Sequence, residues 1–317
     1  MIKRREYSYI CEKEGRVDAV VSEGLGVSRS IFSNPSLELL INGKKAKKSA
    51  KIKAGDKIDI AYDEEVLEGL EKEDIALDII YEDDDILVID KQQGMAVHPG
   101  AGNYSGTVAN ALLGLYGEDF ETGDDELRPG IVHRLDKDTS GVMVIAKNQK
   151  AHLVLSQMFS EHSNEKYYIA ICKGFFPETE GTIDSRIVRD RKNRKKFTTT
   201  KNKSEGRDAL TKYKVVSQNG EYALLKIRIY TGRTHQIRVH LSSIGHPIVG
   251  DPIYGRKDSN LPDATLMLHS SRLAIKHPST GETAVFRSKM PKRFEKALDV
   301  LGLERRALKA FPSAFQR

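Results

Sequence analysis

The spacing of apolar and polar positions near the N-terminus predicts a small folded unit. Valines between positions 17 and 21 fall at i, i+3 and i+4, which indicates a short helix. Asn34 followed by Pro35 is typical of a helix start, so a second helix is expected over 36–41. Residues 51–60 alternate polar and apolar around a Gly-Asp turn, which predicts short strands in a hairpin. Two small helices and a hairpin are therefore expected here.

From residue 77 onward, short apolar runs follow one another closely and predict a larger body. Strands are expected at 79–81, 86–89, 130–135, 141–146, 167–173, 209–216, 222–230 and 266–269. Helices are expected at 108–116, 148–160, 234–244 and 291–301. Several strands follow one another without an intervening helix, which favours an α+β body with a mixed, largely antiparallel sheet over a doubly wound parallel sheet. The chain has no P-loop or GxGxxG pattern, so no nucleotide cofactor is expected.

Charge divides the 317-residue chain into three parts. The net charge is +6, but residues 1–60 carry 13 basic and 8 acidic side chains, whereas residues 61–85 carry 1 and 12. Basic regions on both sides of an acidic segment indicate a polyanionic partner, and nucleic acid is favoured over membrane because no basic amphipathic helix with a bulky apolar face is evident. No apolar run reaches the ~18 residues of a membrane span. Neither membrane insertion nor secretion is expected.

Cysteine and histidine positions argue against disulfides and metal sites. The two cysteines, Cys11 and Cys172, are too few for a disulfide framework and lack the paired spacing of a zinc site. His235 and His240 are five positions apart with no cysteine or carboxylate cluster beside them, so no metal is expected there. A reducing cytoplasm is the expected location.

Two segments concentrate side chains that are able to carry chemistry. The first runs from Arg128 to Gly141 and contains His133, Arg134 and Asp136 at the end of a predicted strand. A carboxylate held among cations stays ionised and can act as a nucleophile or base, but a buried structural ion pair would give the same sequence. Both readings of Asp136 stay open at this point.

The second segment follows the strand predicted to end at Tyr230. Thr234 is expected to cap a helix whose first turn presents His235, Gln236 and Arg238, with Arg233 just before it. Free N–H groups at a helix start favour an anion such as a phosphate. This run is therefore suited to a phosphorylated ligand.

The N-terminal pattern resembles the S-four-type RNA-binding domain, which is named after a small-subunit ribosomal protein. The matching residues are Arg16-Val-Asp, Ser28-Arg29-Ser30, Asn42-Gly43 and Lys51 to Ile60. The resemblance implies RNA contacts from basic side chains of this unit, namely Arg16, Arg29, Lys44 and Lys45.

The larger body resembles the RluA family of pseudouridine synthases over roughly residues 77–300. The motifs that match in order are Ile86-Leu-Val-Ile-Asp-Lys91, His98-Pro-Gly100, His133-Arg-Leu-Asp-Lys-Asp-Thr-Ser-Gly141, Lys166-Tyr-Tyr-Ile-Ala170, Thr231-Gly-Arg-Thr-His-Gln-Ile-Arg238 and Gly245-His-Pro-Ile-Val-Gly-Asp251. One departure is the run Lys91-Gln-Gln-Gly94, where the family has Lys-Pro-x-Gly. With the unit in front, the chain is similar to members that modify large-subunit ribosomal RNA.

The resemblance implies a cofactor-free isomerisation of uridine in RNA. The enzyme breaks the bond from ribose to uracil nitrogen 1, turns the held base and rejoins it through carbon 5. Asp136 is implied as the catalytic aspartate, Tyr168 as the tyrosine that stacks on the flipped base, and Arg238 as the partner of Asp136. Arg134 is implied to fill the gap that the target nucleotide leaves in the RNA stack. His133 in the same motif, and Arg233, His235 and Gln236 in the second motif, are expected to contact RNA. Tyr167 is expected to face the other side of its strand.

Further expectations concern organisation and partners. The domains are expected at 1–62 for the RNA-binding unit, 63–76 for an acidic linker, 77–303 for the synthase and 304–317 for a tail. The segment 186–203 carries nine basic residues and one acidic residue, and Lys195 and Lys196 beside Phe197 are candidate RNA contacts between strands. No obligate protein partner is implied, so a monomer is expected. Two alternatives remain open: a non-catalytic ribosome-assembly factor and a phosphate-dependent nucleoside enzyme.

Overall fold

The chain divides into two units, Met1–Gly69 and Leu70–Arg317, which are described separately. The computed structural model describes residues 2–27, 29–65, 69–100, 103–117, 120 and 128–304. The division at Gly69 falls within the acidic segment 63–76. Of the tail predicted at 304–317, everything after residue 304 lies outside the described residues. None of the helices within these ranges combines the length and apolar character that crossing a membrane requires.

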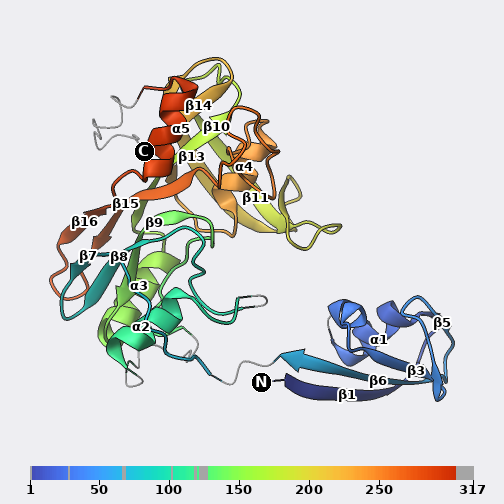
Figure 1. The fold of residues 1–317 in the computed structure, drawn as a ribbon. Helices are drawn as coiled ribbons and strands as arrows, with labels where there is room; N and C mark the ends of the chain where they lie inside the picture. The colour runs from blue at the N-terminus through green and yellow to red at the C-terminus, as the bar shows by residue number, and fades with distance from the viewer. Residues whose placement is uncertain are drawn as a thin grey trace. The chain divides into compact units, whose positions relative to one another are not determined.

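The N-terminal unit packs one helix against a small antiparallel sheet (Figure 1). The sheet has the order β1 (Ile2–Ile10), β6 (Lys57–Glu65), β3 (Glu38–Ile41) and β4 (Lys44–Lys45). A second pair joins β2 (Gly15–Arg16) to β5 (Lys51–Ile52). The predicted valine face of α1 (Val17–Leu25) is buried against Leu39, Ile58 and Ile60 of the sheet. The core of this unit therefore uses the apolar positions that the sequence pattern indicated.

Two predictions for the N-terminal unit are wrong. Residues 36–41 do not form a helix, because the Asn34 side chain accepts a hydrogen bond from the Ser36 N–H at 2.9 Å and closes a turn, after which β3 pairs with β6. A 3₁₀ turn, η1 (Arg29–Ser33), precedes it. The strands of the expected hairpin exist, but β5 pairs with β2 and β6 pairs with β1 and β3. The long strand β1 was not predicted because its charged sequence shows no apolar face.

The larger unit is built on one extended sheet of ten strands. Their order is β12 (Phe197–Thr200), β11 (Glu180–Arg189), β13 (Arg207–Gln218), β14 (Tyr222–Ile229), β10 (Glu165–Lys173), β15 (Leu268–Lys276), β9 (Ser140–Ala146), β8 (Ile86–Lys91) and β7 (Ile79–Glu82), with β16 (Thr283–Arg287) on β15. Within the described strands, β9 and β15 pair in parallel and the other pairs are antiparallel. The predicted α+β class with a mixed, largely antiparallel sheet is confirmed.

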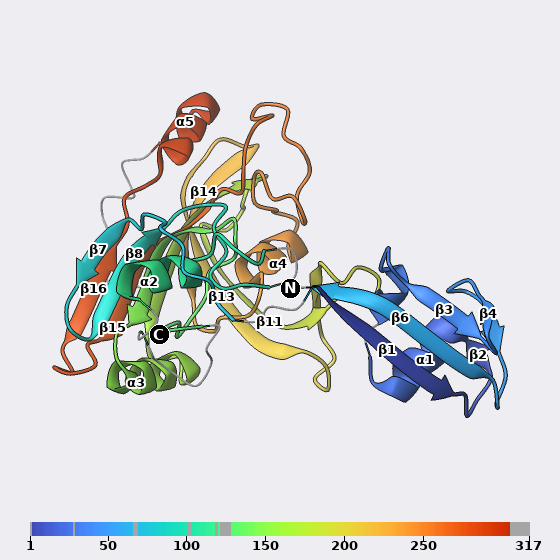
Figure 2. The same ribbon diagram turned by 60° about the horizontal axis from the view of Figure 1, so that its bottom comes forward.

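Four helices flank this sheet close to the predicted positions. They are α2 (Val108–Tyr116), α3 (Gln149–Ser160), α4 (Gln236–Ser243) and α5 (Lys292–Leu301). Their starts follow ordinary capping: the Asn148 side chain accepts from the Ala151 N–H at 2.8 Å, and Thr107 with Asn110 forms a capping box. Figure 2 shows α3 beside the strands β8, β9 and β15, whereas α4 packs on β11, β12 and β13.

The segment predicted as a strand over 130–135 is not one. Ile131 forms an isolated bridge with Ile145, after which the chain turns. β15 pairs with β9 only at Ser140 and Gly141, and the segment meets the rest of that edge at this single bridge. The next backbone N–H along the edge, that of Val144, donates to the His133 ring instead of a backbone carbonyl, so no ladder forms. The strands β11, β12 and β16 were not predicted. Residues 186–189 and 197–200 of the basic segment pair with each other in β11 and β12.

The strand β8 shows why an uninterrupted apolar run predicts a buried strand. Leu87 and Ile89 belong to the main apolar cluster of the unit, whereas Ile86 and Val88 belong to a second cluster with Leu155 of α3. Successive side chains of a strand point to opposite faces, so a strand covered on both sides is apolar at every position. The sheet is therefore the rigid centre from which the loops project.

Candidate active site

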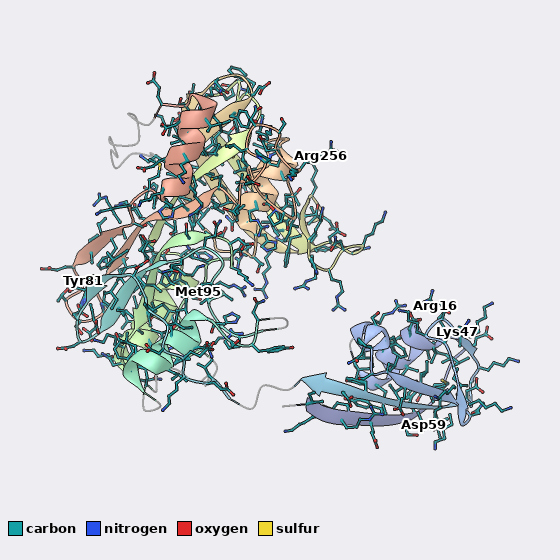
Figure 3. The ribbon with its side chains drawn as sticks, viewed as in Figure 1. Arg16, Lys47, Asp59, Tyr81, Met95 and Arg256 are labelled. Atoms are coloured by element: carbon teal, nitrogen blue, oxygen red, sulfur yellow. The ribbon has the colours of Figure 1, made fainter. Side chains whose placement is uncertain are left out.

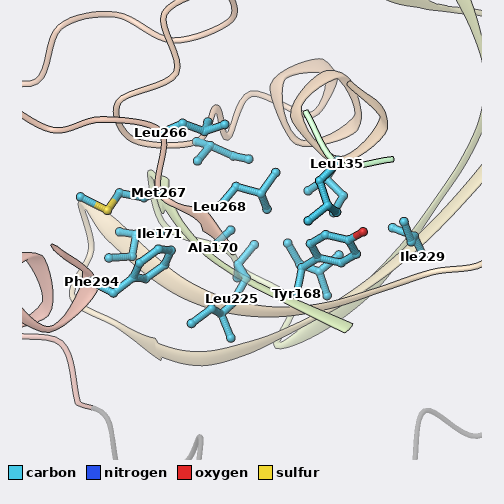
Figure 4. Packing of buried hydrophobic residues seen from close by; sticks show 14 of the residues in the cluster. Leu135, Tyr168, Ala170, Ile171, Leu225, Ile229, Leu266, Met267, Leu268 and Phe294 are labelled. Carbon is cyan, nitrogen blue, oxygen red and sulfur yellow. The ribbon is translucent and has the colours of Figure 1, made fainter. Parts of the chain in front are cut away.

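A small cavity collects the residues of both motifs at one end of the central strands. It has a volume of about 60 Å³ and is lined by the turn after Leu135, by Tyr168 of β10, by Ile229 at the end of β14 and by the start of α4. Figure 4 shows Tyr168 at the edge of the main apolar cluster, with its hydroxyl turned away from Leu225. The cavity thus has an apolar floor and polar walls.

Arg238 lies between two carboxylates in this cavity. Its Nη1 donates to Asp136 Oδ2 at 3.2 Å, while Nε and Nη2 donate to the two oxygens of Asp251, both at 2.8 Å. The Arg238 and Asp251 side chains are 3% and 0% exposed, and Asp136 is 17% exposed. The expected contact between Arg238 and Asp136 is present. The two-point bond to Asp251 fixes the plane of the guanidinium and so the direction in which it meets Asp136.

Asp251 is the residue of this group that the sequence reading left without a role. Burial would raise the pKa of its carboxyl, but the hydrogen bonds and charge of Arg238 and the N–H groups of Tyr254 and Ile253 outweigh burial and lower it. Burial would likewise lower the pKa of Arg238, and Asp251 together with Asp136 raises it instead. Its position at the end of the motif Gly245 to Asp251 was the available signal.

Hydrogen bonds from Lys91 hold the turn that carries Asp136. The buried ammonium of Lys91 donates to three carbonyl oxygens, those of Gln92 at 2.9 Å, Met95 at 2.7 Å and Lys137 at 3.2 Å. Burial lowers the pKa of Lys91 to about 7, although the nearby Asp136 acts in the opposite direction. Lys91 therefore ties the end of β8 to the residue directly after Asp136. Sequence reasoning noted its motif but not this contact.

Gln93 and Gly94, which follow the departure from the family pattern at Gln92, support the same turn. The Gln93 amide donates to the Asp138 carbonyl at 2.8 Å and to the Leu266 carbonyl at 2.9 Å. Gly94 adds a backbone bond to the Lys137 carbonyl at 2.9 Å, in a conformation with φ 87° that favours glycine. Side-chain hydrogen bonds thus hold the turn in a chain that has no proline at position 92.

The start of α4 differs from the expectation. His235, not Thr234, occupies the N-cap position, in a left-handed conformation with φ 57°. Its Nδ1 lies 2.9 Å from the Tyr254 hydroxyl, and its Nε2 lies 4.0 Å from Asp136 Oδ2. Burial lowers the pKa of His235 more than Asp136 raises it, which favours the neutral ring. His235 therefore borders the Asp136 carboxylate as a polar but largely uncharged group.

Gln236 has a structural role in place of the expected RNA contact. Its Oε1 accepts from the Thr231 hydroxyl at 2.7 Å and from the Arg233 N–H at 3.0 Å, and its Nε2 donates to the Leu210 carbonyl and the Thr211 hydroxyl. The buried amide makes these hydrogen bonds to groups of the protein, and they hold the loop before α4 in place. The half-buried Arg233 lies on that loop, and its Nε donates to the Asp208 carbonyl.

His133 and Arg134 differ in their surroundings. The His133 ring stacks on Phe159 at 4.3 Å between centroids, and its Nε2 accepts from the Val144 N–H at 3.1 Å. Burial lowers the pKa of His133 to about 3, so the ring is neutral and packs against Phe159. The RNA contact expected of His133 stays a prediction. Arg134 is exposed at the rim of the cavity.

The two neighbouring tyrosines of β10 point to opposite sides, as expected. Tyr168 is 6% exposed and lines the cavity. Burial is the main cause that raises the pKa of its phenol, and the charge of Asp136 is the second, so the phenol stays protonated. The Tyr167 ring lies beside Arg228 and Arg272, at 5.6 and 4.9 Å from their guanidinium carbons. This pair of similar side chains offers a matched comparison in one strand.

The other predicted RNA contacts lie away from this cavity. In the N-terminal unit, Arg16 and Arg29 both pair with Asp18 at 2.9 Å, and Lys44 and Lys45 are exposed on β4. Figure 3 shows Arg16 and Lys47 among the side chains at the surface of that unit. In the larger unit, Lys195 is exposed and Lys196 half-buried just before β12, where Arg189 lies 5.2 Å from the Phe197 ring.

The fold and this cavity are those of an RNA-modifying isomerase, and comparison with known proteins gives the class. The model of the RNA pseudouridylate synthase family matches residues 85–243. The chain is 42% identical over 301 residues to a protein of Borreliella burgdorferi named ribosomal large subunit pseudouridine synthase D, covering 92% of this chain and 90% of that one. It is 43% identical over 265 residues to an uncharacterized RNA pseudouridine synthase of Aquifex aeolicus, covering 80% and 83%.

A solved structure agrees with this assignment. Human RNA pseudouridylate synthase domain containing 4 superposes with a TM-score of 0.57 at 27% identity, covering 72% of this chain and 94% of that one. The chain belongs to the RNA pseudouridylate synthase family. It is an enzyme that isomerises uridine in RNA to pseudouridine. This finding excludes the alternative of a non-catalytic ribosome-assembly factor.

Proposed function

We propose that the enzyme acts on uridines of large-subunit ribosomal RNA, with Asp136 as the catalytic aspartate. The observation that carries this proposal is the contact of Arg238 with Asp136 in a cavity whose wall is Tyr168. Relatives named for the ribosomal large subunit support the choice of RNA.

The geometry suits a reaction that begins at the ribose. Arg238 donates to Oδ2 of Asp136, so Oδ1 is left to attack the ribose carbon or to remove the 2′ proton. The bond from ribose carbon 1′ to uracil nitrogen 1 breaks, the uracil turns within the cavity, and its carbon 5 bonds to carbon 1′, which breaks any bond formed to Asp136. The carbon 5 proton then leaves to solvent and nitrogen 1 takes up a proton. Atoms and electrons are conserved between uridine and pseudouridine, so the isomerisation needs no redox cofactor. The charge of Asp136 is balanced by an arginine that Asp251 already orients.

Arg134 and Tyr168 complete the proposal. Arg134 stands exposed at the rim, where it can enter the RNA stack and take the place of the target nucleotide as it leaves, a step that costs a few kcal/mol. The Tyr168 ring forms the wall against which the flipped uracil stacks, and its hydroxyl can relay the carbon 5 proton by accepting it at oxygen while its own proton passes to solvent.

We test the class of RNA directly. In the first experiment, purified enzyme is incubated with large-subunit ribosomal RNA labelled with tritium at uracil carbon 5. In the second, pseudouridines are mapped in large-subunit ribosomal RNA isolated from cells with and without the gene. Release of tritium and loss of specific pseudouridines from the mutant cells are expected. Release from transfer RNA alone would reject the proposed substrate.

Tyr168→Phe should slow the chemical step by roughly 10²-fold or more while leaving RNA capture nearly unchanged, because the ring is kept and only the hydroxyl is lost. Tyr167→Phe is the matched control, since its ring lies on the other side of β10 between two arginines. Single-turnover rates at saturating enzyme give the comparison. Equal rates for both variants would remove the proton-transfer role from Tyr168.

The N-terminal unit is proposed to bind RNA through exposed lysines. Lys44→Gln together with Lys45→Gln removes two charges from β4 without disturbing buried contacts. Each phosphate contact contributes about 0.7–0.9 to the slope of log affinity against log salt, so the slope should fall by up to about 1.8. Binding isotherms at several salt concentrations measure it. A slope equal to that of the wild type would show that these lysines do not contact phosphates.

A further inference from the structure

A second cavity adjoins the reaction cavity and has a different character. It has a volume of about 430 Å³ and shares Arg134, Tyr168, Ile229, Gly232 and Arg233 with the first. Its remaining polar lining comes from Ser156 and Ser160 of α3, from His162 just after that helix, from His133 and from Lys166 of β10. Ser156 and Ser160 are one helical turn apart and therefore lie on the same side of α3.

Lys166 is a buried cation that the proposed reaction does not use. Lys166 is only 7% exposed, and its Nζ lies 5.7 Å from the centroid of the Phe159 ring. Lys166 and Tyr168 are two positions apart in β10, so both face the cavities. Burial lowers the pKa of Lys166 to about 8, and the charge of Arg233 is the second cause. Such a lowered pKa is expected for a buried cation that has no anion beside it.

The nearby acidic residue does not neutralise Lys166. Glu165, next to it in the chain, is bound by Arg228 at 3.2 Å and by Arg272 at 2.8 Å. Within the residues that the structure describes, no carboxylate forms an ion pair with Lys166, and none lines this cavity. A buried ammonium beside a second cation is costly unless an anion joins them.

The chemistry of the cavity identifies the anion. The cations Arg134, Lys166 and Arg233 and the two serine hydroxyls are hydrogen-bond donors, and the cavity adjoins the one in which the flipped uridine is proposed to lie. A second base has no aromatic face left to stack on, because Phe159 is stacked with His133 and has Lys166 near its ring, and Tyr168 is assigned to the flipped uracil. We propose that Lys166 and Arg233, with the hydroxyls of Ser156 and Ser160, hold the backbone phosphate next to the target uridine. This inference rests on the proposed RNA isomerisation and adds a phosphate subsite to it.

Lys166→Met tests the subsite because methionine keeps much of the length of the side chain and removes its charge. The RNA concentration at half-maximal single-turnover rate should rise about tenfold, with the rate at saturation within about twofold of the wild type. The slope of log affinity against log salt should fall by about 0.7–0.9. Lys226→Met is the matched control, because Lys226 is a comparably buried lysine of β14 that lies outside both cavities.

A second measurement uses the wild-type protein and so does not depend on how the variant folds. Short RNAs that contain a mapped target uridine carry one neutral methylphosphonate in place of each flanking phosphate in turn. One linkage should raise the half-maximal concentration in the wild type, and the same linkage should have no further effect in Lys166→Met. Loss at no linkage, or equal losses in both proteins at every linkage, would overturn the subsite.

The two levels of the proposal fail in different ways. If the wild type forms no pseudouridine in ribosomal RNA, the proposed function is wrong. If the wild type is active, and Lys166→Met shows the same RNA dependence and salt slope as the wild type, the phosphate subsite alone is wrong. A Lys166→Met protein that melts at the wild-type temperature but loses only its saturated rate would also overturn the subsite.

Discussion

Asp136→Asn is expected to reduce pseudouridine formation by at least about 10³-fold, because the amide cannot act as the nucleophile or base that the proposed reaction needs. Asparagine keeps the shape of the side chain and an oxygen that can accept from Arg238, so the fold and the cavity should remain. Tritium release from large-subunit ribosomal RNA measures the activity. Binding of the same RNA should change by less than about threefold.

Asp138→Asn is the control for that substitution. Asp138 lies in the same turn, but the contact it makes there is through its backbone carbonyl, which accepts from Gln93. The control should retain activity within about tenfold of the wild type. If Asp136→Asn kept activity at that level as well, another group would have to carry the chemical step.

Arg238→Met should both abolish activity and destabilise the larger unit by about 3–5 kcal/mol in free energy of unfolding, because it leaves the fully buried Asp251 without its cation. The companion variant Arg238→Met/Asp251→Asn removes that orphaned charge. Stability should then recover by most of the loss, whereas activity should not, since Asp136 still lacks its partner. Denaturant unfolding and tritium release separate the two effects. Recovery of both would show that Arg238 acts only through stability.

The stability loss of Arg238→Met should depend on pH in a defined direction. In the wild type, the pKa of Asp251 is lowered in the folded state, so its stabilising contribution is present above the unfolded value of about 3.9 and is lost as pH falls below it. Without Arg238, burial is left as the main influence and raises the pKa of Asp251, so folding is increasingly penalised as pH rises. The difference between the two proteins should therefore grow from about pH 4 toward neutral. A difference independent of pH would mean that Asp251 is not the source.

Local sequence signals were sufficient for most elements of the larger unit. The helix α2 has the predicted bounds, and α3, α4 and α5 begin within two residues of prediction, because apolar spacing and caps act within a few residues of the chain. The segment 36–41, predicted as a helix and containing the strand β3 (Glu38–Ile41), shows the limit of such signals. Its Asn-Pro start is compatible with a helix, and pairing with β6, about twenty positions further along the chain, decided the outcome.

The sequence by itself determined the class of enzyme: the motifs around Asp136, Tyr168 and Arg238 indicated it before any geometry was available. Only the tertiary structure decided how these groups are held. Arg238 is 102 positions from Asp136, and its orientation depends on Asp251, to which the motif gave no role. In the same way, folding turned Gln236 into a support for the loop before α4. Contacts of this kind arise from the packing of distant segments into one buried site, and neither spacing nor composition records which buried polar groups become partners.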